Sequence, residues 1–87
     1  MARYRLEIKR SAQKTISRLP RRDAERVRDA IDDLAEEPRP RGANPVAGTP
    51  YSRIRRGDYR IVYEVCEEEL LILVVRIGHR REVYRNL

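Results

Sequence analysis

The first part of the chain changes from a strand pattern to a helix pattern. Tyr4, Leu6 and Ile8 alternate with charged residues, which predicts a strand with one buried face. Ser11 then stands where a helix N-cap is expected, and the apolar residues of 12–19 recur at spacings of three and four. A short helix is therefore predicted directly after the strand.

A second and longer helix is predicted from Arg21 to about Glu37. Its apolar residues fall on one face, and its acidic and basic residues oppose each other at spacings of three and four. Pro20 separates it from the first helix, so we expect a helical hairpin that lies on a sheet. The prolines and glycines of Pro38–Pro50 then predict a surface loop without regular structure.

Three strands are predicted in the second half of the chain. They span Tyr51–Arg56, Tyr59–Cys66 and Leu70–Ile77, joined by a Gly57-Asp58 turn and an acidic turn at Glu67–Glu69. Connections this short make neighbouring strands antiparallel. The continuous apolar run of the last strand predicts a central position, because an exposed edge of that composition would invite aggregation.

These elements define an α+β fold. An N-terminal strand and a two-helix hairpin precede three antiparallel strands that form one twisted sheet, with the helices on one face. Gly78 is expected to end the last strand, and the basic, aromatic segment 79–87 to form a short turn or helix beside the sheet. With 87 residues, the chain suffices for one such domain, residues 1–87, and is too short for two cores.

The charge balance suggests a polyanionic partner. The chain carries 20 Lys and Arg residues against 14 Asp and Glu, a formal charge of +6, and only Lys9 and Lys14 are lysines. Guanidinium groups bind phosphate through a planar fork, so the preference for arginine suits nucleic acid. The single cysteine, Cys66, excludes an internal disulfide and fits the reducing cytoplasm. No apolar run is long enough to span a membrane, and no signal peptide is expected.

Arginines gather on one face of the predicted β-hairpin. Residues two apart in a strand share a face, so Arg53 and Arg55 point the same way. Pairing through the predicted turn would add Arg60 and Glu64 to that open face, opposite the helices. Such a cluster suits phosphate binding, and a merely solvated polar face is the alternative that spacing leaves open.

A second polar group follows the last strand, in the sequence Gly78-His79-Arg80-Arg81-Glu82-Val83-Tyr84-Arg85. His79 is the only histidine, and histidine is the side chain that most readily exchanges a proton near neutral pH. Tyr84 offers a hydroxyl or a stacking ring. On pattern grounds alone, a structural or incidental histidine remains the alternative.

Other chemistries find little support in the sequence. It contains no glycine-rich phosphate loop and no His/Cys ligand set, so no metal and no other cofactor is expected. Cys66 is expected to be a buried packing residue, since the acidic residues beside it oppose a reactive thiolate. The second helix carries carboxylates spaced like a solvated face, Asp29, Asp32, Asp33, Glu36 and Glu37.

Two segments carry a family resemblance, Tyr51-Ser-Arg-Ile-Arg-Arg-Gly-Asp-Tyr-Arg-Ile-Val-Tyr-Glu and Val75-Arg-Ile-Gly-His-Arg-Arg-Glu-Val-Tyr-Arg. They resemble the RelE/ParE superfamily of bacterial toxin–antitoxin modules, specifically its RelE branch, and the order of predicted elements follows that family over nearly the whole chain. RelE proteins are ribosome-dependent endoribonucleases that cut mRNA in the decoding site. ParE relatives of the same fold inhibit DNA gyrase.

The resemblance implies roles for individual residues. The family's basic and catalytic positions fall on Arg53, Arg55, Arg60, Arg80 and Tyr84. The best-known RelE members have lysines where this chain has its first two arginines, and guanidinium is a poor proton carrier. Proton transfer or base stacking is therefore assigned to His79 and Tyr84, with Glu64 as the reserve general base. The neighbouring Arg56, Arg81 and Arg85 are expected to bind RNA.

The implied reaction needs no metal. The ribose 2′-hydroxyl attacks the adjacent phosphate in line and leaves a 2′,3′-cyclic phosphate and a 5′-hydroxyl. Fixed arginine donors would stabilise the developing charge, each by about 3 kcal/mol. From the sequence, His79→Ala is expected to slow cleavage by roughly a hundredfold or more and to leave ribosome binding largely intact.

The resemblance also implies partners. An acidic, partly disordered antitoxin would wrap the domain and cover its basic face, and the target would be the ribosome with mRNA in its decoding site. The free toxin is expected to be a monomer that forms a higher-order complex with its antitoxin. Two other functions stay open: a ParE-like gyrase inhibitor, and a non-catalytic module or degenerate toxin that binds only RNA or antitoxin.

Overall fold

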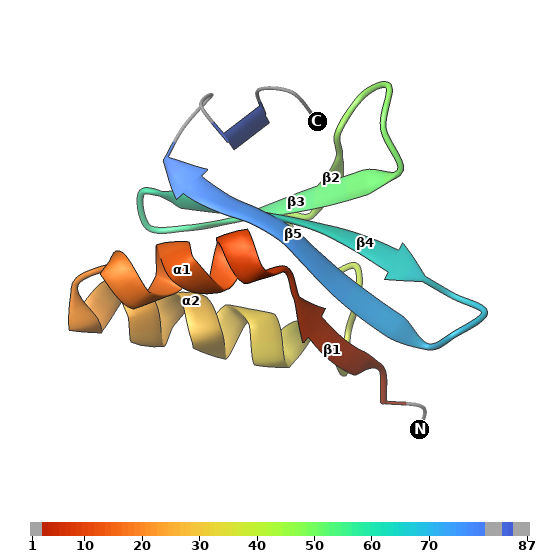
Figure 1. Ribbon diagram of the computed structural model, residues 1–87. Coiled ribbons are helices and arrows are strands. Elements are labelled where there is room, and N and C mark those ends of the chain that lie inside the picture. The colour runs from red at the N-terminus through yellow and green to blue at the C-terminus, as the bar shows by residue number, and fades with distance from the viewer. Residues whose placement is uncertain (1–2, 80–82, 85–87) are drawn as a thin grey trace.

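Two helices cover one face of a sheet in the computed structural model, which describes residues 3–79 and 83–84 (Figure 1). In chain order the elements are β1 (Arg5–Ile8), α1 (Arg10–Arg18), α2 (Arg21–Leu34), β2 (Asn44–Pro45), β3 (Tyr51–Arg56), β4 (Tyr59–Cys66) and β5 (Leu71–His79). The five strands lie in the order β1-β5-β4-β3-β2. The predicted α+β class, with a helical hairpin on one face, is confirmed.

The sheet is mixed. The β3–β4 and β4–β5 pairs are antiparallel, as their short connections predict. The N-terminal strand β1 adds to the outer side of β5 in parallel, with Arg5 opposite Leu71 and Ile8 opposite Val74. The apolar strand β5 therefore lies between β1 and β4, which confirms its predicted central position.

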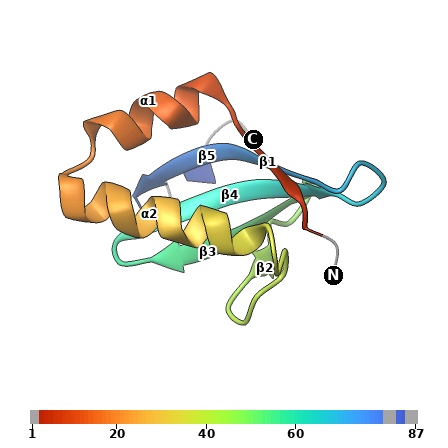
Figure 2. The same ribbon diagram turned by 90° about the horizontal axis from the view of Figure 1, so that it is seen from below.

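The main core fills the space between the helices and the sheet (Figure 2). The helices contribute Ala12, Ile16, Ala24, Val27, Ala30, Ile31 and Leu34. The sheet contributes Ile54, Ile61, Tyr63, Ile72, Val74 and Ile77, the inward half of each strand's alternation. Concentrating the apolar residues in this way lets a highly charged chain bury a core.

Tyr63 joins this core to the loop after α2. Its ring is fully buried, and its hydroxyl donates a 2.7 Å hydrogen bond to the Pro38 carbonyl oxygen. Burial raises the pKa of Tyr63 above the ordinary tyrosine value. The fold therefore favours the neutral phenol, and the stability that depends on it is complete below about pH 10 and is lost as the pH rises through the raised pKa.

Tyr63→Phe is expected to lower the free energy of unfolding at pH 7 by about 1 kcal/mol, because the Pro38 carbonyl loses its donor. The same change should make the alkaline loss of stability shallower, since the buried group can no longer ionise. Urea unfolding between neutral and alkaline pH measures both effects. Curves for the two proteins that stay parallel would contradict this account of Tyr63.

Several predicted boundaries are wrong. Ser11 is not the N-cap of α1, because the Lys9 amide still bonds to the Val74 carbonyl of the sheet and the helix begins at Arg10. The second helix ends at Leu34 instead of about Glu37, since the residue before Pro38 disfavours helical backbone.

The loop and the last strand also differ from the prediction. Within the predicted irregular loop, Asn44 and Pro45 form the short strand β2, which pairs with β3 at the edge of the sheet. An edge position tolerates proline, which lacks an amide donor. Gly78 does not end β5: the strand continues to His79 and pairs Gly78 with Arg60.

A smaller apolar cluster lies on the open face of the sheet, away from the helices. Val62, Val75 and Val83 are buried there, and Tyr51, Leu73 and Tyr84 pack against them. Val83 and Tyr84 belong to a short helical turn that follows β5 and lies over this face (Figure 1). The turn brings the C-terminal tyrosine back onto the sheet.

Candidate functional site

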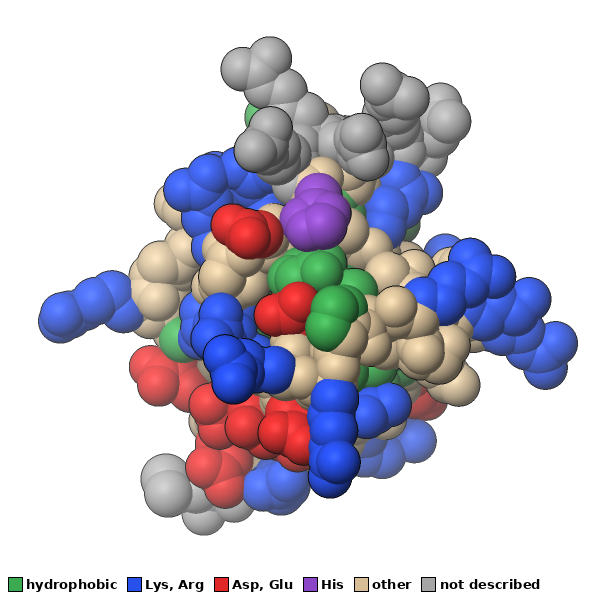
Figure 3. Space-filling model, turned by 90° about the vertical axis from the view of Figure 1, so that its left-hand side faces the viewer, with side chains coloured by type: hydrophobic (Ala, Val, Ile, Leu, Met, Phe, Trp, Pro, Cys, Tyr) green, Lys and Arg blue, Asp and Glu red, His purple; other side chains and the backbone are tan. Residues whose placement is uncertain are grey.

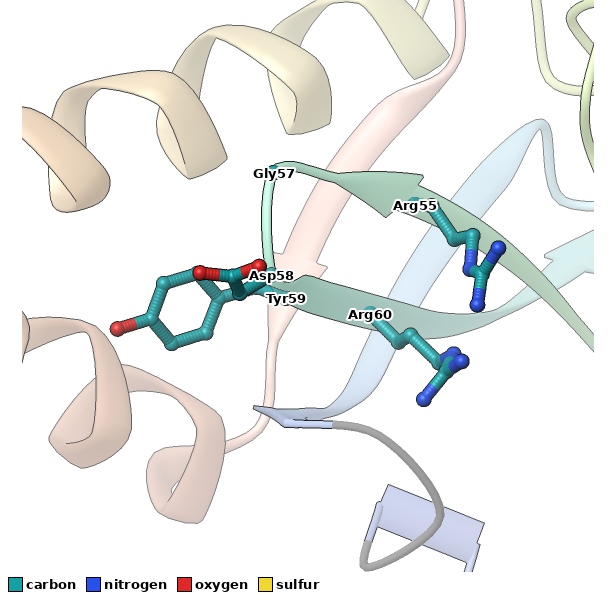
Figure 4. Close-up of a pocket in the computed structure, with 5 residues that line it drawn as sticks. All are labelled: Arg55, Gly57, Asp58, Tyr59 and Arg60. Carbon is teal, nitrogen blue, oxygen red and sulfur yellow. The ribbon is translucent and has the colours of Figure 1, made fainter.

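The open face carries the predicted arginine cluster. Arg55 lies directly opposite Arg60 in the β3–β4 ladder, and Arg53 lies opposite Val62. The intervening Ile54 is buried on the helix side, so the three arginines share the open face as predicted. The Arg55 and Arg60 side chains point to the same side of the hairpin (Figure 4).

Among the residues that the structure describes, no acidic side chain pairs with these arginines. Within residues 3–79 and 83–84, the ion pairs are Arg3–Glu36, Arg21–Glu25 and Arg39–Glu67. Like charges directly opposite each other destabilise a sheet. An anion bound between Arg55 and Arg60 would relieve this repulsion.

Arg60 and Tyr84 come together on the open face, near the β3–β4 turn. The Arg60 guanidinium carbon lies 5.9 Å from the centroid of the Tyr84 ring, a cation–π distance. Arg60 Nη1 and the Tyr84 hydroxyl are buried, and neither has a hydrogen-bond partner among the described residues. Leaving such a polar atom buried and unpaired costs about 1–3 kcal/mol, so both atoms are suited to a ligand with oxygen atoms.

The hairpin turn forms a pocket of about 280 Å³ beside these arginines. Five residues line it: Arg55, Gly57, Asp58, Tyr59 and Arg60 (Figure 4). Gly57 has φ +59°, and a Cβ atom there would lie 2.6 Å from Arg26 Nη1 of α2. Glycine therefore fits both the backbone of the turn and the close approach of α2.

His79 does not join the arginine cluster. It pairs with Tyr59 on the helix side of the sheet, and the two rings stack at a centroid distance of 4.3 Å. The Tyr59 hydroxyl lies 3.4 Å from Asp23 Oδ2, and burial, followed by the Asp23 charge, raises the pKa of Tyr59. The histidine is exposed at the surface, with an acidic side chain beside it (Figure 3). His79 therefore lies on the opposite face of the sheet from Arg60 and Tyr84.

The structure also keeps Arg56 and Glu64 away from Arg55 and Arg60. Arg56 lines a hollow on the helix side together with Asp33, Glu36 and Glu37, and its Nη1 donates to its neighbour's carbonyl. Glu64 shares the open face and lies four positions along β4 from Arg60, so their Cα atoms are about 13 Å apart. It pairs with Tyr51 instead of lying beside Arg55 and Arg60.

Three further arginines that the sequence singles out, Arg80, Arg81 and Arg85, lie outside the described residues. Within the described ranges, no group of three or more His, Cys, Asp or Glu side chains could hold a metal ion. No helix there is long and apolar enough to cross a membrane.

Cys66 was expected in the core, and that prediction is wrong. It is half-buried at the end of β4 and lies outside both apolar clusters. Partial burial raises the pKa of the Cys66 thiol, and the nearby carboxylates of Glu64, Glu69 and Glu7 raise it further. The thiol is therefore held in its unreactive protonated form.

Sequence reasoning missed Arg76, which the structure places beside the C-terminal turn. Its Nη1 donates a 3.2 Å hydrogen bond to the Val83 carbonyl oxygen. An arginine within an otherwise apolar strand was the available signal, because a charge in such a run needs a partner or a polar surface.

Comparisons with known proteins agree with this fold. The family model described as the ParE toxin of type II toxin–antitoxin systems matches residues 6–84. Toxin RelG of Mycobacterium tuberculosis is 33% identical over an alignment of 87 positions. The alignment covers 95% of this chain and 98% of that toxin. The chain belongs to the RelE/ParE toxin family of type II toxin–antitoxin systems.

Solved structures place the chain among the RelE-like members. The archaeal RelE–RelB complex from Pyrococcus horikoshii matches with a TM-score of 0.81 and 30% identity, covering 93% of this chain and 98% of that one. The intact Escherichia coli RelBE toxin–antitoxin complex matches with a TM-score of 0.78 and 26% identity, covering 90% and 98%. The chain is thus a RelE-like toxin, and both of these relatives were crystallised with their RelB antitoxin.

Proposed function

We propose that this toxin is a ribosome-dependent endoribonuclease that cleaves mRNA on the open face of its sheet. The observation that carries the proposal is the cluster in which Arg60 lies opposite Arg55 and beside the Tyr84 ring. Among the described residues, the two arginines have no acidic partner, and Arg60 Nη1 and the Tyr84 hydroxyl are buried without a hydrogen-bond partner. A phosphodiester supplies the negative charge and the acceptor oxygens that this arrangement lacks. RelE-type relatives support the same activity by analogy.

The reaction can proceed with groups from the RNA and these side chains. The ribose 2′-hydroxyl attacks the adjacent phosphorus as the bond to the 5′-oxygen breaks, giving a 2′,3′-cyclic phosphate and a 5′-hydroxyl. Arg55 and Arg60 stabilise charge on the phosphate oxygens, and Arg53 holds the neighbouring backbone. The Tyr84 hydroxyl gives its proton to the departing 5′-oxygen and takes up the proton that the 2′-hydroxyl releases, so the tyrosine ends the reaction unchanged. Arginine does this poorly because it stays protonated.

An acidic antitoxin would neutralise the toxin by covering the same face. Arg53, Arg55 and Arg60 offer it charge, and the half-buried rings beside Val62 offer it apolar surface. Binding of antitoxin and of mRNA should therefore exclude each other.

We assign His79 a smaller role in cleavage than the sequence analysis did. Because its ring stacks on Tyr59 on the helix side, we expect His79→Ala to slow single-turnover cleavage by less than about tenfold, below the usual range for a general acid or base. The measurement uses toxin in excess over the ribosome–mRNA complexes. A loss of a hundredfold or more would restore His79 as the proton-transfer group.

The proposal is tested with mRNA programmed on ribosomes, purified toxin, and mapping of the cut sites by primer extension. Naked mRNA runs in parallel. Cleavage only on ribosomes, with a 2′,3′-cyclic phosphate end, is the expected result. Intact mRNA under all conditions would refute the proposal.

A gyrase inhibitor is the second candidate, because the matching family model describes a ParE toxin. A supercoiling assay with the same protein preparation separates the two functions. Loss of supercoiling with intact mRNA would assign the chain to the ParE activity.

A further inference from the structure

A β-bulge places two neighbouring residues of β5 on the open face. The register between β4 and β5 shifts by one residue between Val62 and Tyr63, so Val75 has no partner in β4. A bulge interrupts the alternation of side chains along a strand. Val75 therefore packs on the open-face cluster, while the next residue, Arg76, lies opposite Val62 and faces the same side.

This placement lets Arg76 hold the turn that carries Tyr84. Its guanidinium donates to the Val83 carbonyl oxygen at 3.2 Å, and the Val83 side chain is only 2% exposed between its valine neighbours. The turn packs directly on the strand, because a Cβ atom on Gly78 would lie in ordinary van der Waals contact with the Val83 side chain, at 3.6 Å. Within the described residues, this hydrogen bond and the buried Val83 side chain hold the turn against the sheet.

We infer that Arg76 is a positioning residue of the RNA-cleaving site. By holding the Val83 carbonyl it keeps the Tyr84 ring 5.9 Å from the Arg60 guanidinium and its hydroxyl inside the site. A tyrosine in the short C-terminal turn would otherwise exchange among many orientations, and a catalytic group acts only within a narrow geometry. The consequence for catalysis rests on the proposed function, whereas the placement of Tyr84 does not.

Arg76→Ala is expected to lower kcat for mRNA cleavage on ribosomes by about tenfold, the effect of losing one hydrogen bond to a charged group. KM should stay within about twofold, because the loss affects the reacting geometry and not the docking of the toxin. Arg76→Lys keeps a cationic donor and should recover part of the lost rate. Arg28→Ala, which removes an exposed arginine from α2, is the matched control and should leave both constants unchanged.

A double-mutant cycle decides whether Arg76 acts through Tyr84. In a Tyr84→Ala background the change Arg76→Ala should cause no further loss, because there is no longer a hydroxyl to position. Independent losses that multiply would mean that Arg76 contacts the RNA itself and would overturn the inference. An unchanged kcat for Arg76→Ala would overturn it as well.

The third measurement does not depend on cleavage. NMR spectra of tyrosine-labelled toxin, with Tyr84 assigned through Tyr84→Phe, should show the Tyr84 ring signals moving toward solvent-exposed values in Arg76→Ala, while the Tyr63 signals stay in place. Static Tyr84 signals would refute the positioning role. If wild-type toxin leaves mRNA intact but the Tyr84 signals move, the proposed function fails and the structural role of Arg76 stands.

Discussion

Replacing Arg60 by alanine is expected to slow mRNA cleavage on ribosomes by about 100- to 1,000-fold, the usual effect of removing one fixed donor from developing charge. Arg60 is central because it lies opposite Arg55 in the sheet and beside the Tyr84 ring. Its Nη1 is buried and has no hydrogen-bond partner within residues 3–79 and 83–84. The planar guanidinium group can donate two hydrogen bonds to one phosphate, in addition to supplying charge. Arg60→Lys should therefore remain at least about tenfold slower than wild type.

The same substitution should leave the fold intact. Losing the contact with Tyr84 lowers the free energy of unfolding by about 0.5–1 kcal/mol, and losing the repulsion from Arg55 raises it by a similar amount. Urea unfolding at neutral pH should thus give nearly the wild-type midpoint, and Arg28→Ala on α2 serves as the charge-matched control for cleavage. Near-normal single-turnover cleavage by a folded Arg60→Ala protein would remove Arg60 from the mechanism.

The architecture of this toxin follows from local patterns, but the partners of its strands do not. Alternation in residues 4–8 and the apolar run of β5 predict two strands, yet nothing in either pattern says that they pair in parallel. The strand β2 leaves no pattern at all, because only Asn44 and Pro45 pair with β3. Pairing partners depend on the packing of the whole domain, which a local period does not encode.

The candidate site shows the same division. Period-two spacing correctly places Arg53, Arg55 and Arg60 on one face, because the β3–β4 hairpin is regular. His79 was expected to act with them because it is the only histidine and because the family resemblance calls for a proton carrier where arginines replace lysines. Counting two residues on from the buried Ile77 would have placed His79 on the helix side, where the structure has it.

The bulge has the opposite effect on Arg76. Regular alternation from Leu73 would turn Arg76 under the helices, and the extra residue Val75 returns it to the open face. No sequence period predicts a bulge. Arg60 and Tyr84 were both predicted as site residues from the sequence. The role of Arg76 in bringing them together is visible only in the folded chain.

Tyr84→Phe is expected to slow cleavage by about 100-fold while it stabilises the toxin or leaves its stability unchanged. The hydroxyl is buried without a hydrogen-bond partner in the described structure, so the folded free toxin gains nothing from it. A group that is costly in the free protein and useful only when RNA is bound contributes to catalysis, not to folding. Phenylalanine keeps the ring beside Arg60 and removes only that hydroxyl.

Tyr84→Ala separates the ring from the hydroxyl. If proton exchange by the hydroxyl carries the effect, alanine should be only a few-fold slower than phenylalanine, the remainder being about 1 kcal/mol of ring contact with Arg60. Single-turnover cleavage and urea unfolding of both variants test this. Wild-type cleavage by Tyr84→Phe with a severe loss in Tyr84→Ala would show that the ring stacks on the RNA, and the proton would then have to be carried by another group.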